Sequence, residues 1–304
     1  MSSLLEMTDV PMTNILEKCG FKSVLTLRKV CHSLRNFIDD SCFKTDLDSI
    51  EITIGPNGFF VICRTNPLWT NRTSLADGWN SKDLKTILKM TQNTKLSRIC
   101  VNTNRDNAEG LNVLEEILKN QTRPLQAEQF EMGGSEILKV LPYIDSKILK
   151  EIYIRPARRA GADDQVLDGI EEVIELEQFK NAMELTIDYC FLVRADLRKF
   201  FHFQRVSMKL HETSLEELVA LKEAFVTSTH MVYFTLSGRG LNKNQLAQMF
   251  GTPFHDPRPF GTAQWFFKIQ NCKEHVLRIE WGLGGLKFRK LEANEVPQDA
   301  VVQH

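Results

Sequence analysis

The first forty residues carry hydrophobic side chains at the spacing of α-helices. Leu27, Val30, Cys31, Leu34 and Ile38 recur at intervals that place them along one face of a helix. The positions between them hold mainly basic and polar side chains, as expected for a solvent-facing side. The pattern predicts an amphipathic helix across residues 27–40, with Cys31 as a small buried side chain on its apolar face.

Two shorter helical segments are predicted upstream. Ile15, Leu16 and Cys19 form one apolar stripe, and Gly20 has the position of a residue that ends a helix. Ser23 is then a candidate N-cap for the second segment. Because a few short helices bury little area by themselves, exposed apolar surface on this module suggests a binding partner.

From residue 45 onward the hydrophobic period changes to that of half-buried β-strands. A short alternating phrase recurs as LDSIEI (47–52), LSRICV (96–101), AEQFEM (127–132), LKEIYI (149–154), AMELTI (182–187), FQRVSM (203–208) and MVYFTL (231–236), and more loosely as QWFFKI (264–269) and VLRIEW (276–281). Helix-like segments follow most copies, for example at 110–120, 135–144 and 214–225. Ser214 and Glu217 form a potential capping box ahead of the last one.

Alternating strands and helices predict βα units and a mainly parallel sheet. The strand centres are spaced by 31, 22, 33, 21 and 28 residues, at Ile99, Phe130, Ile152, Leu185, Val206 and Phe234. Such uneven spacing without an Asn or Cys ladder favours an irregular leucine-rich-repeat-like domain, and a non-repeating α/β domain is the alternative. The segment IEITIGPNGFFVICR is expected to form a hairpin that turns at Gly55–Gly58. The predicted class is α+β, with a helical module at 1–44 and a βα domain at 45–304.

Composition narrows the classes of function. The formal net charge of −1 provides no global field for nucleic acid or an anionic membrane. The seven cysteines are isolated, odd in number and without a C-x-x-C pair, which indicates reduced thiols and a cytoplasmic or nuclear location. We expect no signal peptide and no transmembrane segment, because the N-terminal residues lack a basic region and the apolar runs are short.

The candidates for chemistry have simpler structural interpretations. Cys31 and His32 are adjacent on the predicted helix and so face different directions, which makes them a poor nucleophile and base. His202 is interpreted as a packed or capping residue, and WGLGGL (281–286) as a β-turn. The histidines and cysteines lack zinc-ligand spacing, so we predict no metal, no cofactor and no catalytic residue. A cysteine hydrolase is the least favoured alternative.

Two loops of the second domain are candidates for binding a target. The loop after the strand that ends near residue 154 clusters arginines that suit an acidic or phosphorylated partner, although a solvated loop is the simpler interpretation. The loop at 251–261 is rich in proline and aromatic residues, which either contact a target or fold back onto the domain. The candidate residues are Arg155, Arg158, Arg159, Phe254, His255 and Phe260.

Residues 7–39 resemble an F-box without gaps, and the run FKSVLTLRKVCHSLRNFIDD is especially similar to nematode F-box proteins that carry an FTH domain. The resemblance implies docking to a Skp-type adaptor, and through it to cullin and RING subunits. The residues expected to contact the adaptor are Met7, Met12, Ile15, Leu16, Phe21 and Leu25. The residues expected in the F-box core are Val24, Leu27, Val30, Cys31, Leu34 and Ile38.

The later part of the chain resembles the FTH domain through LPYID (141–145), LEQFKNAMEL (176–185), FFHFQRV (200–206), ALKEAF (220–225) and MFG (249–251). The resemblance implies that this domain binds a target, so the expected function is the substrate-recognition subunit of a cullin–RING ubiquitin ligase. Thr8 replaces the signature proline of the F-box, and Pro11 stands where an apolar residue is usual. These departures keep open an interaction scaffold or translational regulator whose F-box no longer recruits a ligase.

Overall fold

The computed structural model describes residues 9–41, 43–56, 58–65, 74–79, 81–103, 108–157, 165–238, 242–255 and 262–303 of the chain. The chain folds as two compact units. Unit 1 comprises Met1–Glu151 with Ala157–Ala160, and unit 2 comprises Ile152–Pro156 with Gly161–His304. The predicted division between residues 44 and 45 lies inside unit 1, and it stays a prediction.

Unit 1 begins with the helices α1 (Asp9–Lys18), α2 (Phe21–Leu27) and α3 (His32–Asp40). The prediction of one continuous helix across 27–40 was wrong, because α2 ends at Leu27 and α3 begins at His32. Cys31 lies between them with an extended backbone (φ −156°) and is the N-cap of α3. Gly20 is the N-cap of α2 and has φ −62°, so it is not a left-handed helix end, and Ser23 lies inside α2.

A mixed sheet follows in unit 1. Its strands are β1 (Leu47–Gly55), β2 (Gly58–Thr65), β3 (Ser74–Trp79), β4 (Leu96–Thr103) and β5 (Ala127–Gly133), in the order β3-β2-β1-β4-β5. The predicted hairpin is confirmed, since β1 and β2 are antiparallel with Gly55 opposite Gly58. On its other side β1 pairs parallel with β4, and β4 pairs parallel with β5. The longer helices of this region are α4 (Ser81–Met90) and α5 (Ala108–Lys119).

Unit 2 continues the alternation of strands and helices. Its central strands are β6 (Glu151–Arg155), β8 (Glu184–Ile187), β10 (Arg205–Leu210), β11 (Tyr233–Gly238), β15 (Gly285–Glu292), β14 (His275–Gly282), β13 (Ala263–Lys268) and β12 (Phe254–His255), given in their order across the sheet. The strands β8, β10 and β11 are parallel, whereas β11, β15, β14, β13 and β12 pair antiparallel. Short strands lie beside these at β7 (Gln165–Val166), β9 (Phe191–Val193) and β16 (Val302–Gln303).

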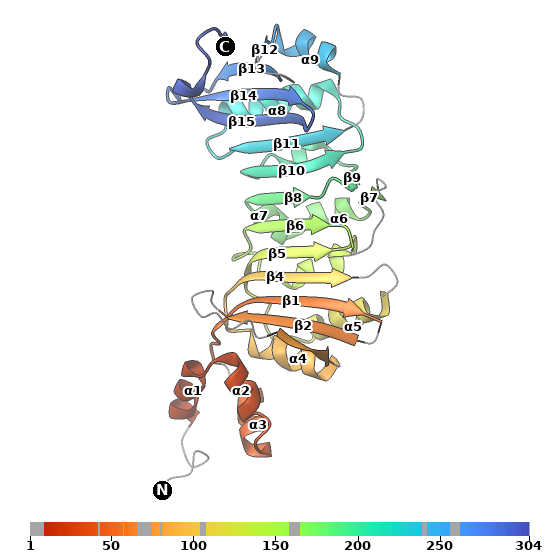
Figure 1. Cartoon of the computed structure of the whole chain (residues 1–304), viewed down its shortest axis with the longest axis vertical. Coiled ribbons are helices and arrows are strands. Elements are labelled where there is room, and N and C mark those ends of the chain that lie inside the picture. The colour runs from red at the N-terminus through yellow and green to blue at the C-terminus, as the bar shows by residue number, and fades with distance from the viewer. Residues whose placement is uncertain are drawn as a thin grey trace. The chain divides into compact units, whose positions relative to one another are not determined.

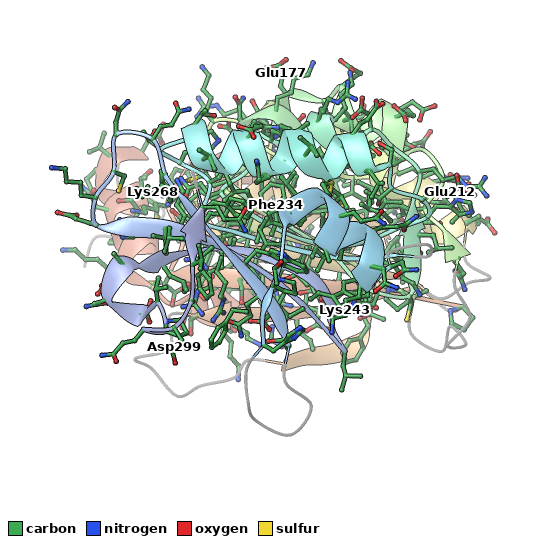
Figure 2. The ribbon with its side chains drawn as sticks, turned by 90° about the horizontal axis from the view of Figure 1, so that it is seen from above. Glu177, Glu212, Phe234, Lys243, Lys268 and Asp299 are labelled. Carbon is green, nitrogen blue, oxygen red and sulfur yellow. The ribbon has the colours of Figure 1, made fainter. Side chains whose placement is uncertain are left out.

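The α-helices of unit 2 cover one face of its sheet. They are α6 (Ile170–Ile174), α7 (Glu177–Asn181), α8 (Leu215–Thr227) and α9 (Lys243–Phe250). Figure 1 shows α8 behind the strands β14 and β15. Phe225 of α8 lies 5.3 Å from Phe234 and 5.7 Å from Phe288 between ring centroids. Figure 2 shows Phe234 in the interior, with Glu177 at the outer edge of the helical side. Burial of these large aromatic side chains against α8 favours the folded state strongly.

The connections between strands explain the uneven spacing of the phrases. The long spacings contain α-helices, such as α5 between β4 and β5 and α8 between β10 and β11. The short ones contain 3₁₀ helices: η2 (Ile137–Lys139) and η3 (Leu141–Tyr143) precede β6, and η4 (Leu197–Phe200) precedes β10. The segment 135–144 therefore forms two 3₁₀ turns in place of the predicted helix, and Pro142 lies in the second. The α+β class and the mainly parallel sheet are confirmed.

Candidate functional site

The helices of the F-box region bury one apolar face and expose other apolar side chains. Val24, Leu34 and Ile38 are buried, as predicted for the core. Met12, Leu16 and Phe21 were expected to contact the adaptor, but they are also buried within this chain. Because these three apolar side chains already pack against their own fold, the structure assigns them to the packing of the helices.

The exposed surface of these helices includes two valines. Val10 is 71% exposed and Val30 is 66% exposed, which corrects the expectation that Val30 belongs to the core. Ile15 and Leu25 are half-buried and so contribute partly to the surface, as does Leu27, which was expected in the core. Met7 lies outside the described residues. Exposed apolar side chains on a small helical module are typical of an interface with another protein.

Cys31 owes its position to a hydrogen bond rather than to an apolar stripe. Its Sγ accepts a hydrogen bond from the backbone N–H of Leu34 at 3.5 Å, and the side chain is half-buried. The expectation that Cys31 is a core residue within a helix is therefore wrong. The role of an N-cap is usually taken by serine, threonine, aspartate or asparagine, so the capping sulfur was not recognised in the sequence.

An arginine joins the F-box helices to each other and to α4. The Nε and Nη2 atoms of Arg28 lie 2.6 and 2.9 Å from the two carboxylate oxygens of Asp39, and Nη2 also lies 3.4 Å from Oγ1 of Thr86. The hydrogen bond to Asp39 raises the pKa of the Arg28 guanidinium. The paired N–H groups of arginine fix direction as well as distance. In addition, the N–H of Phe21 donates to Asp46 at 2.8 Å, which ties the start of α2 to the segment before β1.

Unit 2 has a second accessible surface on the side of its sheet opposite the helices. Registered positions across neighbouring strands define this surface, which we call the polar face of unit 2. It consists of Glu184 and Thr186 of β8, Arg205, Ser207 and Lys209 of β10, Tyr233, Thr235 and Ser237 of β11, Lys287 and Arg289 of β15, and Arg278 and Glu280 of β14. These residues alternate with buried ones, such as Val206 and Phe234, that face the helices.

The polar face of unit 2 is accessible but only partly paired. Arg205 lies 3.2 Å from Glu184. Glu280 is shared by Arg278 at 3.2 Å and Lys287 at 3.9 Å. Beside this face, the hydroxyl of Tyr189 lies 3.2 Å from that of Ser207. The face therefore offers guanidinium, ammonium and hydroxyl donors to a partner, a set suited to recognising anions.

The loops predicted to bind a target lie partly outside the described residues. Arg158, Arg159 and Phe260 are among the residues that the structure does not describe. Arg155 ends β6, where it alternates with the buried Ile154 and so lies on the side of that strand that faces away from the core. Its assignment to target binding stays a prediction.

The two described residues of the aromatic loop behave differently from each other. Phe254 is half-buried, and it packs against a small cluster of Phe266, Val276 and Leu291. Its ring lies 6.4 Å from that of Phe266. Phe254 thus folds back onto the domain, which was one of the two interpretations from the sequence. His255 is exposed and pairs with Ala263 through the backbone of β12 and β13, so it stays a candidate contact.

The side chains considered for chemistry have structural roles or lie apart. His202 keeps an exposed edge, but its ring lies 4.0 Å from that of Phe203 between centroids and its Nε2 lies 3.0 Å from the carbonyl oxygen of Phe179. Partial desolvation lowers the pKa of the imidazole, in line with the interpretation of a packed histidine. The segment WGLGGL contains the turn of the β14–β15 hairpin, where Gly285 has φ +94°.

Among the described residues, no cluster of three or more His, Cys, Asp and Glu side chains is arranged to hold a metal ion. In the same part of the chain, no helix is both long and apolar enough to cross a membrane.

Sequence reasoning missed the polar face of unit 2 as a site. Its residues are separated by long stretches of chain, and they meet only because strands from β8 to β14 stand side by side. The available signal was the polar member of each alternating phrase, such as the arginine, serine and lysine of RVSMKL (205–210). That signal predicts which side chains of a strand share one face, but it does not predict which strands are adjacent in the sheet.

Comparison with protein families places the F-box helices in one known domain, and the strands β8, β10 and β11 of the polar face in another, whereas β14 and β15 lie beyond the second match. An F-box domain model matches residues 4–46, and an FTH domain model matches residues 108–254. No curated protein matches the chain significantly. The chain is an F-box protein whose F-box is followed by an FTH domain. An F-box indicates an adaptor role in ubiquitin ligases through a Skp-type partner, F-box proteins are generally non-catalytic, and the FTH domain suggests a C-terminal interaction domain.

Proposed function

We propose that this chain is the substrate-recognition subunit of an SCF-type cullin–RING ubiquitin ligase. Its F-box docks a Skp-type adaptor, which links it to the cullin and RING subunits, and its C-terminal domain selects a target protein. The observation that carries this proposal is the F-box match at residues 4–46 on helices that expose Val10 and Val30. We further propose that the protein acts in the cytoplasm, the nucleus or both.

The chain contributes position rather than chemistry to ubiquitin transfer. Holding a target beside the ubiquitin-loaded enzyme raises the effective concentration of the reacting groups. The charge pair of Arg28 and Asp39 supports this role because it holds α2 against α3, and Arg28 also reaches Thr86 of α4. A defined direction between the adaptor-binding helices and the following sheet is what a positioning subunit requires.

The adaptor interface is tested with two matched substitutions at exposed valines. Val30→Asp places a carboxylate on the F-box, whereas Val301→Asp does so at a position of unit 2 that is 77% exposed. We expect Val30→Asp to weaken capture of purified Skp-type adaptor by about 10-fold or more, as for a central apolar contact, while Val301→Asp leaves it unchanged. Binding is measured with purified full-length chain by surface plasmon resonance.

Failure of the wild-type chain to bind the adaptor would refute the ligase proposal. It would favour an interaction scaffold or translational regulator that uses the same C-terminal domain. Equal loss of adaptor binding in both valine variants would show that a general effect of charge, and not the F-box surface, was being measured.

A further inference from the structure

The polar face of unit 2 contains buried polar atoms without hydrogen-bond partners among the described residues. Thr235 is only 3% exposed, and its Oγ1 atom has no hydrogen-bond partner in the described residues. The same holds there for Oγ of Ser237 and Nε of Arg278, which are also shielded from solvent. Polar atoms removed from water are almost always paired in folded proteins. Unpaired donors on β11 and β14, which are separated by β15 in the same sheet, therefore indicate a missing acceptor on this face.

The polar face of unit 2 also has fewer carboxylates than cationic side chains. Arg205, Arg278, Lys287 and Arg289 face only two carboxylates within the described part of the polar face, those of Glu184 and Glu280. Arg278 and Arg289 stand directly opposite each other on the antiparallel strands β14 and β15. Like charges in that position are destabilising. A bound anion removes this repulsion, so the arrangement favours an anionic partner.

The spacing of the cations favours a row of anionic groups over a single one. Arg205 lies on β10, Arg289 on β15 and Arg278 on β14, and Tyr233 of β11 stands in register between Arg205 and Arg289. Because neighbouring strands lie about 4.8 Å apart, the row spans roughly 14 Å. An extended peptide directs every second side chain to the same side at intervals of about 6.6 Å. Two or three carboxylates along such a peptide match the row, whereas one phosphate reaches only part of it.

We propose that the polar face of unit 2 binds an extended segment of the target that is rich in aspartate and glutamate. This proposal rests on the proposed function, because it names the class of target that the C-terminal domain selects. The guanidinium groups of Arg205, Arg278 and Arg289 hold the carboxylates through paired hydrogen bonds, and Thr235 and Ser237 donate their hydroxyls. The ring of Tyr233 lies under the peptide between two of the arginines.

The direct test uses purified full-length chain in complex with its adaptor and three fluorescent peptides. The peptides are an alternating Glu–Ala sequence, the corresponding Gln–Ala sequence, and the Gln–Ala sequence with one phosphoserine. Fluorescence anisotropy should detect binding of the Glu–Ala peptide that weakens as salt rises, and much weaker binding of the other two. Equal binding of the Gln–Ala peptide, or preference for the phosphoserine peptide, would overturn the proposal.

Two pairs of charge reversals locate the binding surface. The double variant Arg205→Glu and Arg289→Glu should weaken binding of the Glu–Ala peptide by about 10-fold or more. The matched control is Arg198→Glu with Lys199→Glu, which makes the same change in charge on η4, beside α8 on the helical side. Both control residues are exposed, so the fold should tolerate the change. Equal affinity in the two double variants would overturn the assignment to this face.

A hydroxyl deletion separates binding from folding. Thr235→Val removes an unpaired hydroxyl, so the free protein should melt at the same or a higher temperature while it binds the Glu–Ala peptide more weakly. Unchanged peptide affinity would remove Thr235 from the site. Adaptor capture, measured in parallel, should be the same in every variant of this face, because the F-box belongs to unit 1. Loss of adaptor capture by the wild-type chain would refute the ligase role but not the affinity for the acidic peptide.

Discussion

Unit 1 and unit 2 each present a polar face on their sheets, but the two faces differ in how their charges are paired. In unit 1, Glu51 of β1 receives hydrogen bonds from Arg64 and Asn102, each at 3.0 Å. Arg98 of β4 pairs with Glu131 of β5, which is almost fully buried. Among the buried side-chain atoms of this set in the described residues, Nε of Arg98 lacks a hydrogen-bond partner.

The polar face of unit 2 is also built from alternating positions on neighbouring strands, but its charged and polar groups are paired less completely. Its cations outnumber its carboxylates, two arginines stand opposite each other, and the hydroxyls of Thr235 and Ser237 lack acceptors within the described chain. The comparison teaches that alternation along a strand does not by itself identify a binding face. The unit 1 face stabilises its own fold, whereas the unit 2 face retains donors that a partner can use.

The largest difference between the units is expected in the reactivity of their thiols. Burial raises the pKa of Cys63 in unit 1 to about 12, and its side chain is fully buried. In unit 2, Sγ of Cys272 lies 3.5 Å from Nδ1 of His275, and hydrogen bonds lower the pKa of this thiol. Because the thiolate is the reactive form, iodoacetamide should modify Cys272 at least about 100-fold faster than Cys63, which reacts only when the fold opens.

Mass spectrometry of the labelled protein over time measures both rates. Cys272→Ala should abolish the fast phase, and His275→Ala should slow it. Cys100, which is buried and donates to Asn102, should behave like Cys63. Rapid labelling of Cys63 in the folded protein would contradict the closed interior assigned to unit 1.

A second difference is expected when a carboxylate is neutralised in each face. Glu131→Gln leaves Arg98 without its charged partner beside a buried site, and we expect a loss of about 2 kcal/mol in the free energy of unfolding, reduced from the value for a fully buried pair because Arg98 is 42% exposed. The matched change Glu184→Gln in unit 2 affects a pair in which both side chains are exposed, and should cost no more than about 0.5 kcal/mol. Urea denaturation measures both, and equal losses would remove the contrast between the faces.

A third comparison concerns one type of substitution, Thr to Val, which we expect to destabilise the protein in unit 1 and to stabilise it in unit 2. Thr53 of unit 1 accepts a hydrogen bond from Asn102 at 3.4 Å, so Thr53→Val should destabilise the protein by about 0.5–1 kcal/mol. Thr235→Val removes a buried hydroxyl without a partner, so it should stabilise the protein by up to about 1 kcal/mol. Destabilisation by both variants would show that Thr235 has an acceptor, and would weaken the inference of an open binding face.

Much of the fold was predictable from the sequence because it rests on local patterns. The period of two placed the centres of β4, β5, β6, β8, β10 and β11 correctly. Ser214 and Glu217 form the predicted capping box of α8. Each of these features depends on residues within one turn or one strand, so no knowledge of distant contacts was needed.

The site was less predictable because it depends on partners that are distant in the chain. The pairing of Glu51 with Asn102, and the opposition of Arg278 and Arg289, follow from strand order and register, which the alternating pattern does not specify. In the F-box, the apolar stripe from Leu27 to Ile38 suggested one helix. The start of a new helix after Cys31 was not recognised, because sulfur is rarely the capping atom. The exposure of Val30 is a consequence of that break.

The smallest expected effect is a pH dependence of stability that is larger in unit 1 than in unit 2. Lys150 and Lys95 hold the pKa of Glu128 at about 2, below its ordinary value of 4.5. Since the folded-state pKa is lower, Glu128 contributes stability above about pH 4.5 and loses that contribution as the pH falls toward 2. The side chain is 34% exposed, so screening should limit the loss to about 1 kcal/mol or less.

Urea denaturation between pH 5 and about pH 2.5 measures this loss, which added salt should reduce. Glu128→Gln should flatten the pH dependence of stability across that interval. In unit 2, Glu175 is the matched control, because its pKa is also lowered, by Lys180, but its side chain is 65% exposed. Glu175→Gln should therefore change the curve less. A larger effect at Glu175 than at Glu128 would contradict the conclusion that charges in unit 1 are paired mainly for the stability of its own fold.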